Sequence, residues 1–230
     1  MNLHEQLARE TAADREFLLS APVIQRCLAG DVTRELYLEF LTQAYHHVRH
    51  TVPLLMAVGA RLPERHAWLQ APILHYLEEE TGHDQWILND IEHAGGDRVA
   101  AAASTPAVAT EAMFAYAWDT VMRGNPLGFF GMVYVLEGTS VALALRAADG
   151  IQSALGLPGR AFSYLRSHGE LDKEHVQDLA NILAKFTDAR DQEAVIGCAR
   201  GIFWLYGNVF HGLGARPVAA AASGNLRKTA

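Results

Sequence analysis

The chain has 230 residues, half of them hydrophobic, so it is long enough and apolar enough to bury a sizeable core. Its formal net charge of −7 and the lack of any Lys/Arg cluster argue against a nucleic-acid partner. Two cysteines without a CxxC pair make no disulfide framework, so a cytoplasmic location is expected. Residues 1–20 resemble no signal peptide, and Glu137 interrupts the most apolar run, so no membrane partner is expected.

The first half of the chain predicts helices only. Apolar positions three or four residues apart over 3–19 predict an amphipathic surface helix, followed by a short helical turn over 20–30. The next helix is expected over 33–60, with a kink at Pro53. A long helix over 63–93 ends this half, because two glycines follow it directly.

The second half continues the same pattern after a connector that is expected over 97–106. Further helices are expected at 107–122, 126–155, 160–167, 169–186 and 189–213. No strand-like alternation bounded by turn residues is convincing. The predicted fold class is therefore all-α, a single bundle of about seven helices. It forms one domain over 1–215, with 216–230 as a flexible C-terminal tail.

The stretch HGELDKEH, residues 168–175, places two histidines and an aspartate close together in a helical segment. At about 100° per residue, His168, Asp172 and His175 lie within an arc of roughly 60° on one helix face. Imidazole and carboxylate groups at these spacings can bind one divalent ion. The alternative is a partly exposed helix face that carries an Asp–His pair, and this stretch alone does not decide between the two.

A second carboxylate–imidazole cluster lies in HYLEEETGHDQWILNDIE, residues 75–92. Glu79 and His83 are four residues apart, and Glu80 and His83 are three apart, so either pair presents both groups on one helix face. A solvated acidic face is the alternative, since acidic residues near a helical histidine are common.

The third feature is Glu137, the only charged residue within 124–145. A glutamate in the centre of such an apolar helix should be paired, protonated or bound to a metal. An ion pair with an arginine such as Arg49 or Arg146 is the non-metal alternative. The sequence therefore marks this residue as a site candidate without fixing its partner.

Together these three features resemble the haem-oxygenase-like diiron oxidases and oxygenases, whose wider relatives include the TenA and PqqC proteins. The stretch YVLEGTS also resembles the haem oxygenases themselves, and AYHHVRHTVPLL is similar to an early helix of this superfamily. The resemblance covers about residues 33–213. The separations of 54 residues from His83 to Glu137 and 31 residues from Glu137 to His168 are similar to those between ligands of the diiron members.

The resemblance implies a bundle with two iron ions in its middle. The positions that match its ligands are His83, Glu137, His168, Asp172 and His175. It also implies that Glu137 bridges the two ions. The remaining ligand departs from the family, because members place a glutamate seven or three residues before the first histidine, and Tyr76 and Glu80 stand there in this chain. Glu79 is a further option, so one or two irons remain open, and Tyr76 is a candidate redox-active or hydrogen-bonding group.

Other polar and aromatic residues are candidates for the wall of the site. The predicted pocket residues are Tyr76, His46, His47, His50, Phe130 and Tyr134. The early-helix histidines among them either bind substrate, supply a ligand, or are simply hydrogen-bonded. The last helix carries the aromatic residues Phe203, Trp204, Tyr206 and Phe210. These are expected to be mostly core, with some closing the pocket.

The ligand types predict Fe(II), one or two ions per chain, because carboxylate and imidazole suit ferrous iron. The predicted function is a non-haem iron, and specifically diiron, oxidase or oxygenase. Its expected partners are dioxygen, a small substrate such as an amino acid, amine or fatty acid, and a second copy of the chain in a homodimer.

Three other function classes stay open. A haem-binding oxygenase needs one axial histidine from the early helix and leaves 168–175 without a role. A TenA-like thiamin-related hydrolase needs a nucleophilic cysteine, and neither Cys27 nor Cys198 has an activating partner visible in the sequence. A non-enzymatic helical interaction protein predicts no bound metal and no buried polar cluster.

Overall fold

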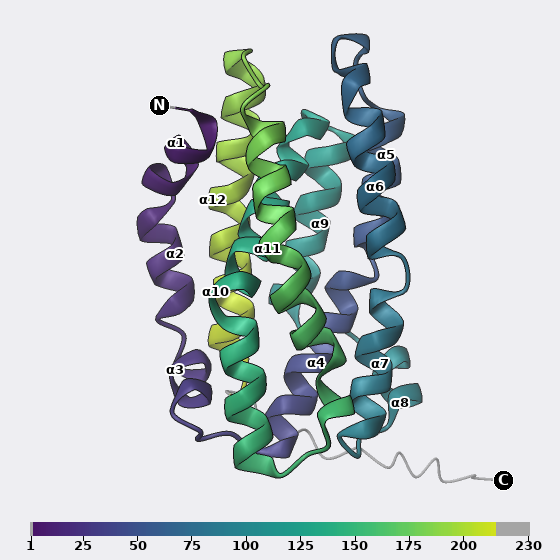
Figure 1. Ribbon diagram of the computed structural model, residues 1–230, viewed down its shortest axis with the longest axis vertical. Helices are drawn as coiled ribbons and strands as arrows, with labels where there is room; N and C mark the ends of the chain where they lie inside the picture. The colour runs from purple at the N-terminus through teal and green to yellow at the C-terminus, as the bar shows by residue number, and fades with distance from the viewer. Residues whose placement is uncertain (1, 215–230) are drawn as a thin grey trace, which may run out of the picture.

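The helices of the computed structural model run up and down one elongated bundle (Figure 1). The structure describes the backbone of residues 2–214 and the side chains of 2–169 and 175–214. Residues 2–214 contain no strand, so the predicted all-α fold class is confirmed. The predicted tail over 216–230 lies outside the described residues.

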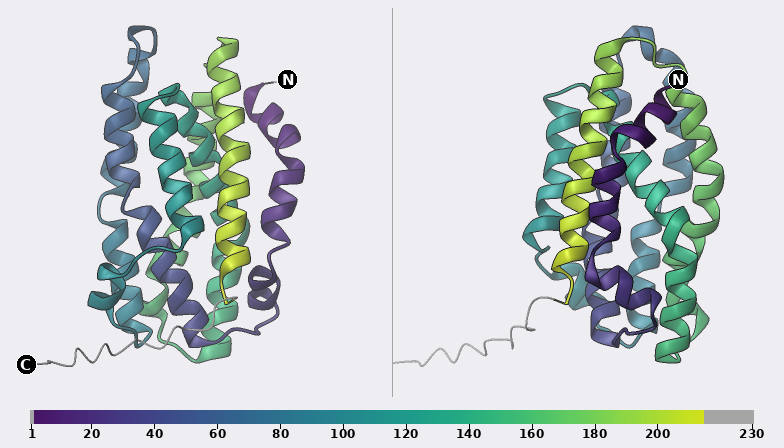
Figure 2. Two further views of the ribbon diagram at one scale, coloured as in Figure 1. Left: turned by 180° about the vertical axis from the view of Figure 1, so that it is seen from behind. Right: turned by 90° about the vertical axis from the view of Figure 1, so that its left-hand side faces the viewer.

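Helices α1 to α8 make up the first half of the chain. Their bounds are α1 Leu3–Glu10, α2 Ala12–Leu19, α3 Pro22–Leu28, α4 Arg34–Val48, α5 Thr51–Ala60, α6 Gln70–Glu80, α7 His83–His93 and α8 Arg98–Ala103, with the 3-10 turn η1 Glu64–Leu69 before α6. Helices α1 to α3 follow one another along the flank that α10 and α12 form (Figure 2).

Helices α9 to α12 make up the second half. Their bounds are α9 Val108–Met122, α10 Phe129–Leu155, α11 Ser163–Leu183 and α12 Ala189–Gly212, with the 3-10 turns η2 Pro126–Gly128 and η3 Gly159–Phe162 between them. The long helix α10 packs against both α11 and α12, so Glu137 lies in the middle of the bundle.

The described residues form more helices than the seven predicted, because long helical columns are broken. One break falls at Arg49 and His50, just before Pro53. Proline lacks an N–H and its ring clashes with the carbonyl four residues earlier, so the chain bends at that point. The expected 63–93 helix is likewise divided, with a second break at Thr81 and Gly82.

Two further sequence expectations are wrong. The supposed connector over 97–106 contains α8, because the Asp97 carboxylate caps it by accepting bonds of 2.9 Å from two backbone N–H groups. The expected break near Gly169 is absent, and α11 is continuous there. A Cβ on Gly169 would lie 2.6 Å from Leu145, so this glycine permits close helix packing and does not end a helix.

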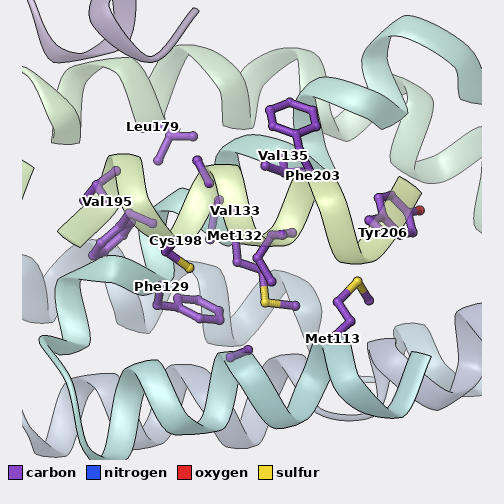
Figure 3. Packing of buried hydrophobic residues seen from close by; sticks show 14 of the residues in the cluster. Met113, Phe129, Met132, Val133, Val135, Leu179, Val195, Cys198, Phe203 and Tyr206 are labelled. Atoms are coloured by element: carbon purple, nitrogen blue, oxygen red, sulfur yellow. The ribbon is translucent and has the colours of Figure 1, made fainter. Parts of the chain in front are cut away.

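The core is densely packed where α9, α10 and α12 meet (Figure 3). Met113, Phe129 and Met132 are each at most 2% exposed there. A Cβ on Gly131 would collide with the backbone of α12 at Val195, so a glycine is required for α10 and α12 to approach this closely. The close contact fixes the position of α10 and hence of the glutamate that it carries.

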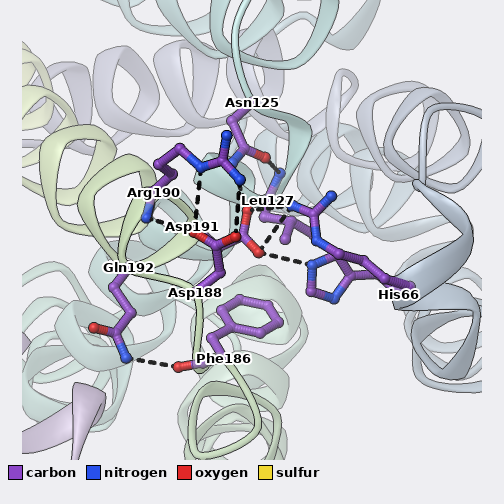
Figure 4. A network of polar contacts seen from close by, with 9 residues as sticks. His66, Asn125, Leu127, Phe186, Asp188, Arg190, Asp191 and Gln192 are labelled. Carbon is purple, nitrogen blue, oxygen red and sulfur yellow. Dashed lines mark hydrogen bonds and ion pairs between the residues drawn. The ribbon is translucent and has the colours of Figure 1, made fainter.

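A buried polar network ties the start of α12 to η1 and to the turn before η2 (Figure 4). Asp191 is fully buried and accepts hydrogen bonds from Arg65 at 3.0 Å and from Asn125 at 2.8 Å. Its second oxygen lies 2.7 Å from Nε2 of His66. Because its partners come from η1 and from the turn before η2, this one carboxylate joins three segments.

Residues 126–155 are long and apolar enough to cross a membrane by length and composition alone. From the sequence, no membrane partner is expected, because Glu137 interrupts this run. The apolar 18-residue stretch within this range is 56% buried inside the bundle, where α10 packs against α11 and α12. A core helix of this kind has the same composition as a membrane span.

Candidate metal centre

The centre is built around the break between α6 and α7. Thr81 has an extended ψ of 116° and Gly82 has a φ of 98°, a left-handed conformation that strongly favours glycine. The break places Glu80 at the end of one helix and His83 at the start of the next. Their side chains therefore meet through a turn and not through the continuous helix that the sequence suggested.

Three donor side chains converge at this break. The ligand atoms of Glu80, His83 and His168 all lie within 4.8 Å of one another. Nδ1 of His83 is 3.1 Å from Oε2 of Glu80, and the rings of His83 and His168 are 4.7 Å apart. His83 is only 1% exposed, and its Nε2 has no hydrogen-bond partner among the described residues. A buried imidazole nitrogen without a partner is expected where a ligand is missing.

A second group of donors lies beside the first. Nε2 of His175 is 2.8 Å from Oε2 of Glu79, and its Nδ1 is 3.7 Å from Oε1 of Glu137. Glu137 is 7% exposed. It faces this histidine, whereas Arg49, one of its suggested ion-pair partners, lies over the Tyr45 ring. The structure thus brings Glu79 and Glu80 to two different histidines.

Asp172 stands on α11 between His168 and His175, as the sequence spacing requires. Its side chain lies outside the described residues. Its backbone position, one helical turn from each histidine, leaves it a candidate member of the second group.

The three early-helix histidines have separate environments. Nε2 of His46 bonds to the Ser104 hydroxyl at 2.8 Å, and Nδ1 of His50 accepts a hydrogen bond from the Trp118 indole at 3.2 Å. Only His47 lines the cavity that also contains Glu80. Burial, reinforced by nearby His168, lowers the pKa of His47 to about 3. This imidazole is therefore neutral at physiological pH.

Of the three aromatic residues that were predicted to line the pocket, only Tyr76 does so. Tyr76 lines the cavity, and its ring lies 5.4 Å from that of His175. Burial, and next the Glu137 carboxylate, raise the pKa of Tyr76, so its hydroxyl keeps its proton. Phe130 is fully buried in the apolar core, and Tyr134 lines a different cavity beside α1 and α2.

The cavity at the centre has a volume of about 160 Å³. Its polar end is formed by Glu80, Glu137, His168, His47 and Tyr76. Tyr206 and Phe210 of α12 close part of it, as was expected for some aromatic residues of that helix, while Trp204 is 58% exposed. The remaining wall is largely aliphatic.

Sequence reasoning missed Tyr164, whose ring lies 4.8 Å from that of His168 and which lines the cavity. Its spacing of four residues from His168 was the available signal. It also missed Ser140, one turn after Glu137 on the same face of α10. A lone hydroxyl in an apolar helix gives too weak a pattern to single out.

Carboxylate and imidazole donors at one end of a largely apolar cavity suit a first-row divalent metal such as ferrous iron. Sulfur ligands are absent from the centre as far as its side chains are described. The donor set is therefore of the kind used for carboxylate-bridged metals in helical bundles.

Residues 38–207 match a family of proteins described as iron-containing redox enzymes. No curated protein matches this sequence.

Solved structures show the same fold. A domain of unknown function from Shewanella denitrificans, with a haem-oxygenase-like fold, superposes with a TM-score of 0.81 at 24% identity, covering 93% of this chain and 92% of that one. A haem oxygenase from Leptospira interrogans gives 0.74 at 16% identity, covering 93% and 100%. A TenA homologue from Pseudomonas syringae gives 0.74 at 11% identity, covering 91% and 90%. The predicted haem-oxygenase-like fold is thereby confirmed.

Proposed function

Because this chain belongs to the family of iron-containing redox enzymes, we propose that it holds ferrous iron at Glu80, His83 and His168 and oxidises a small molecule with dioxygen. The observation that carries the proposal is the convergence of these three donors around a buried imidazole nitrogen that has no partner among the described residues. The 3.1 Å contact between Nδ1 of His83 and Oε2 of Glu80 holds these two donors side by side.

A second iron would be held by His175, Glu79 and Glu137, with Asp172 as the next candidate ligand. The support is the pair of contacts that His175 makes, 2.8 Å to one carboxylate and 3.7 Å to the other. Glu137 contacts His175 and lines the same cavity as Glu80 and His168, so we propose a diiron centre in which this carboxylate would be shared by the two ions.

Ferrous iron supplies the dioxygen chemistry when it is bound, and the chain supplies the surroundings. The aliphatic wall excludes water, and the neutral His47 adds no charge to the cavity. Tyr76 keeps its proton because burial and Glu137 raise its pKa, so its Oη can donate a hydrogen bond to a polar group of the substrate.

The alternatives have weaker support. A TenA-like hydrolase needs a reactive thiol, but burial raises the pKa of Cys27 and raises that of Cys198 to about 12. A haem-binding oxygenase has one axial candidate that lines the cavity, His47, and leaves the Glu80 cluster without a role. An interaction protein gives no reason for a buried cluster of carboxylates and imidazoles.

Metal analysis after anaerobic loading with Fe(II) tests the proposal. We expect about one to two ions per chain and no haem absorbance, because the donors are oxygen and nitrogen atoms of side chains. His83→Ala and His168→Ala should each lose about one ion, whereas His93→Ala, at the opposite end of α7 from His83, should lose none. Unchanged iron content in both His83→Ala and His168→Ala would refute the assignment.

A further inference from the structure

The cavity extends well beyond the candidate metal centre. Helix α10 lines it with one face, from Phe129 past Glu137 to Ile151. Between Glu137 and Ile151 the helix advances by about 20 Å at 1.5 Å per residue. The metal centre therefore lies at one place along a cavity whose lining continues far toward the end of α10.

This extension, the apolar arm, is walled on its other side by α3 and the start of α4. The residues that line it are Val23, Ile24, Cys27, Leu28, Val32, Leu36, Tyr37, Phe40, Leu143, Ala144, Ala147 and Ile151. None carries a charge, and the small side chains of Ala144 and Ala147 leave space between α10 and α3. Apart from Cys27, Tyr37 and Phe40, the side chains that line the arm are aliphatic, so it suits a hydrocarbon chain better than a polar ring.

The charges in the cavity are confined to its other end. Among the described residues no lysine or arginine lines the cavity, and the only acidic side chains that do so are Glu80 and Glu137. A free amino acid carries both an ammonium and a carboxylate, and burying either without a partner is costly. The arm has no charged partner for either group, but each methylene that it removes from water makes the binding free energy more favourable.

We propose that the substrate is a single-chain aliphatic amphiphile, whose chain lies in the apolar arm and whose polar head lies at the metal centre. The identity of this compound as a substrate rests on the proposed function. Its binding does not, because the arm is formed by the protein alone and can be tested without iron.

Calorimetric titration of the metal-free protein with straight-chain alcohols, from hexanol to hexadecanol, tests the chain. Affinity should rise about fourfold for each added methylene, because each one is removed from water. The increase should stop at the chain length that fills the arm. Affinity that does not depend on chain length would overturn the proposal, even if iron binds as proposed.

Variants at the arm locate the chain. In Ala147→Phe, affinity should stop rising with chain length at a shorter alcohol than in the wild type. Hexanol binding should be unchanged, since the new side chain fills only the far part of the arm. Ala154→Phe, on the exposed side of the same helix, should change neither. If Ala147→Phe does not fold, Cys27→Leu narrows the arm from the opposite wall and should act in the same way. Equal weakening of all the alcohols would contradict chain binding in the arm.

Fatty acids and alkyl amines of matched length identify the head group, in the presence and absence of iron. At least one series must show the same break in chain-length dependence as the alcohols. If neither does, the compound is not an amphiphile of this kind. A normal break together with no iron uptake would leave the chain site standing and would refute the proposed function alone.

Discussion

At the residue scale, two adjacent glutamates contact two different histidines. Glu79 contacts His175 and Glu80 contacts His83, because consecutive residues on a helix point about 100° apart. The question of which glutamate is the ligand therefore has a different answer for each group of donors. Each carboxylate is a candidate ligand for its own ion.

The variants Glu80→Gln and Glu79→Gln should separate the two ions. Glu80→Gln should weaken iron at His83 and His168 and leave iron at His175 in place, and Glu79→Gln should do the reverse. Each should lower the iron content by about one ion per chain, at an Fe(II) concentration that just fills both sites of the wild type, because an amide is a poorer ligand than a carboxylate. Titrating the variants with Fe(II) and counting the bound ions checks this. A single iron that depends only on Glu80 would show that the centre is mononuclear.

At the element scale, the break between α6 and α7 decides the shape of the centre. Gly82 holds a positive φ with open space around the position of a Cβ, so only the backbone conformation demands glycine there. The break turns the end of α6 toward the start of α7. A helix that continued through Thr81 would carry the two donor side chains on a common face instead.

Gly82→Ala should lower the free energy of unfolding by about 1–2 kcal/mol, the cost of a left-handed conformation for a residue with a Cβ. It should also lower iron affinity, because relief of the strain moves His83 relative to Glu80. Gly197→Ala is the control, since this glycine is exposed, helical and free of nearby atoms. Urea unfolding and iron titration measure both effects. Equal iron affinity in both variants would mean that the break does not position the donors.

The Asp191 network is the second feature at this scale, because it joins α12 to η1 and to the segment before η2. Burial alone would raise the pKa of Asp191, but hydrogen bonds from Asn125, His66 and Arg65 outweigh it and hold the pKa below its ordinary value. A carboxyl whose pKa is lower in the folded protein stabilises the fold above the unfolded pKa. That stabilisation is lost as pH falls through the folded pKa.

Asp191→Asn should therefore lower the free energy of unfolding by about 1–3 kcal/mol at pH 7, since it removes a buried acceptor that Asn125, His66 and the half-exposed Arg65 share. The difference from wild type should shrink below about pH 4, where Asp191 of the unfolded wild-type chain takes up its proton, and vanish below the lower pKa of the folded state. Asp188→Asn, which keeps an N-cap residue on α12, should cost only a few tenths of a kcal/mol. Urea unfolding at several pH values measures both. A difference that grows on acidification would contradict this account.

At the scale of the whole molecule, the candidate centre joins α6, α7, α10 and α11 in the middle of the bundle. Any ion bound there holds these helices together and binds the folded state alone. Metal binding should therefore raise the stability of the whole domain by mass action.

Free Fe(II) at about a hundred times its dissociation constant should stabilise the protein by about 2.7 kcal/mol. For a chain of this size, that corresponds to a rise of about 5–10 °C in the melting temperature. Anaerobic thermal melts with and without Fe(II) measure it, and His83→Ala should show a much smaller rise. A wild-type melting temperature that does not respond to Fe(II) would rule out a centre that joins these helices.

The sequence by itself determined the fold class and the candidate donors. Helical periodicity shows which side chains share a face. A single glutamate in an apolar helix is a site candidate, because burying an unpaired carboxylate is unfavourable. That is why His83, Glu137, His168 and His175 could be singled out, together with the haem-oxygenase-like fold that their separations suggested.

Only the tertiary structure decided which faces meet. Phe130 and Tyr134 are turned away from the centre, His46 and His50 bond elsewhere, and Tyr164 is turned toward it. The bend before Pro53 was expected from the sequence, but the break at Thr81 and Gly82 was not, because a single glycine can be accommodated within a helix or can end it. Periodicity fixes a residue's direction relative to its own helix, whereas the neighbouring helix and the angle of approach depend on packing across the whole core.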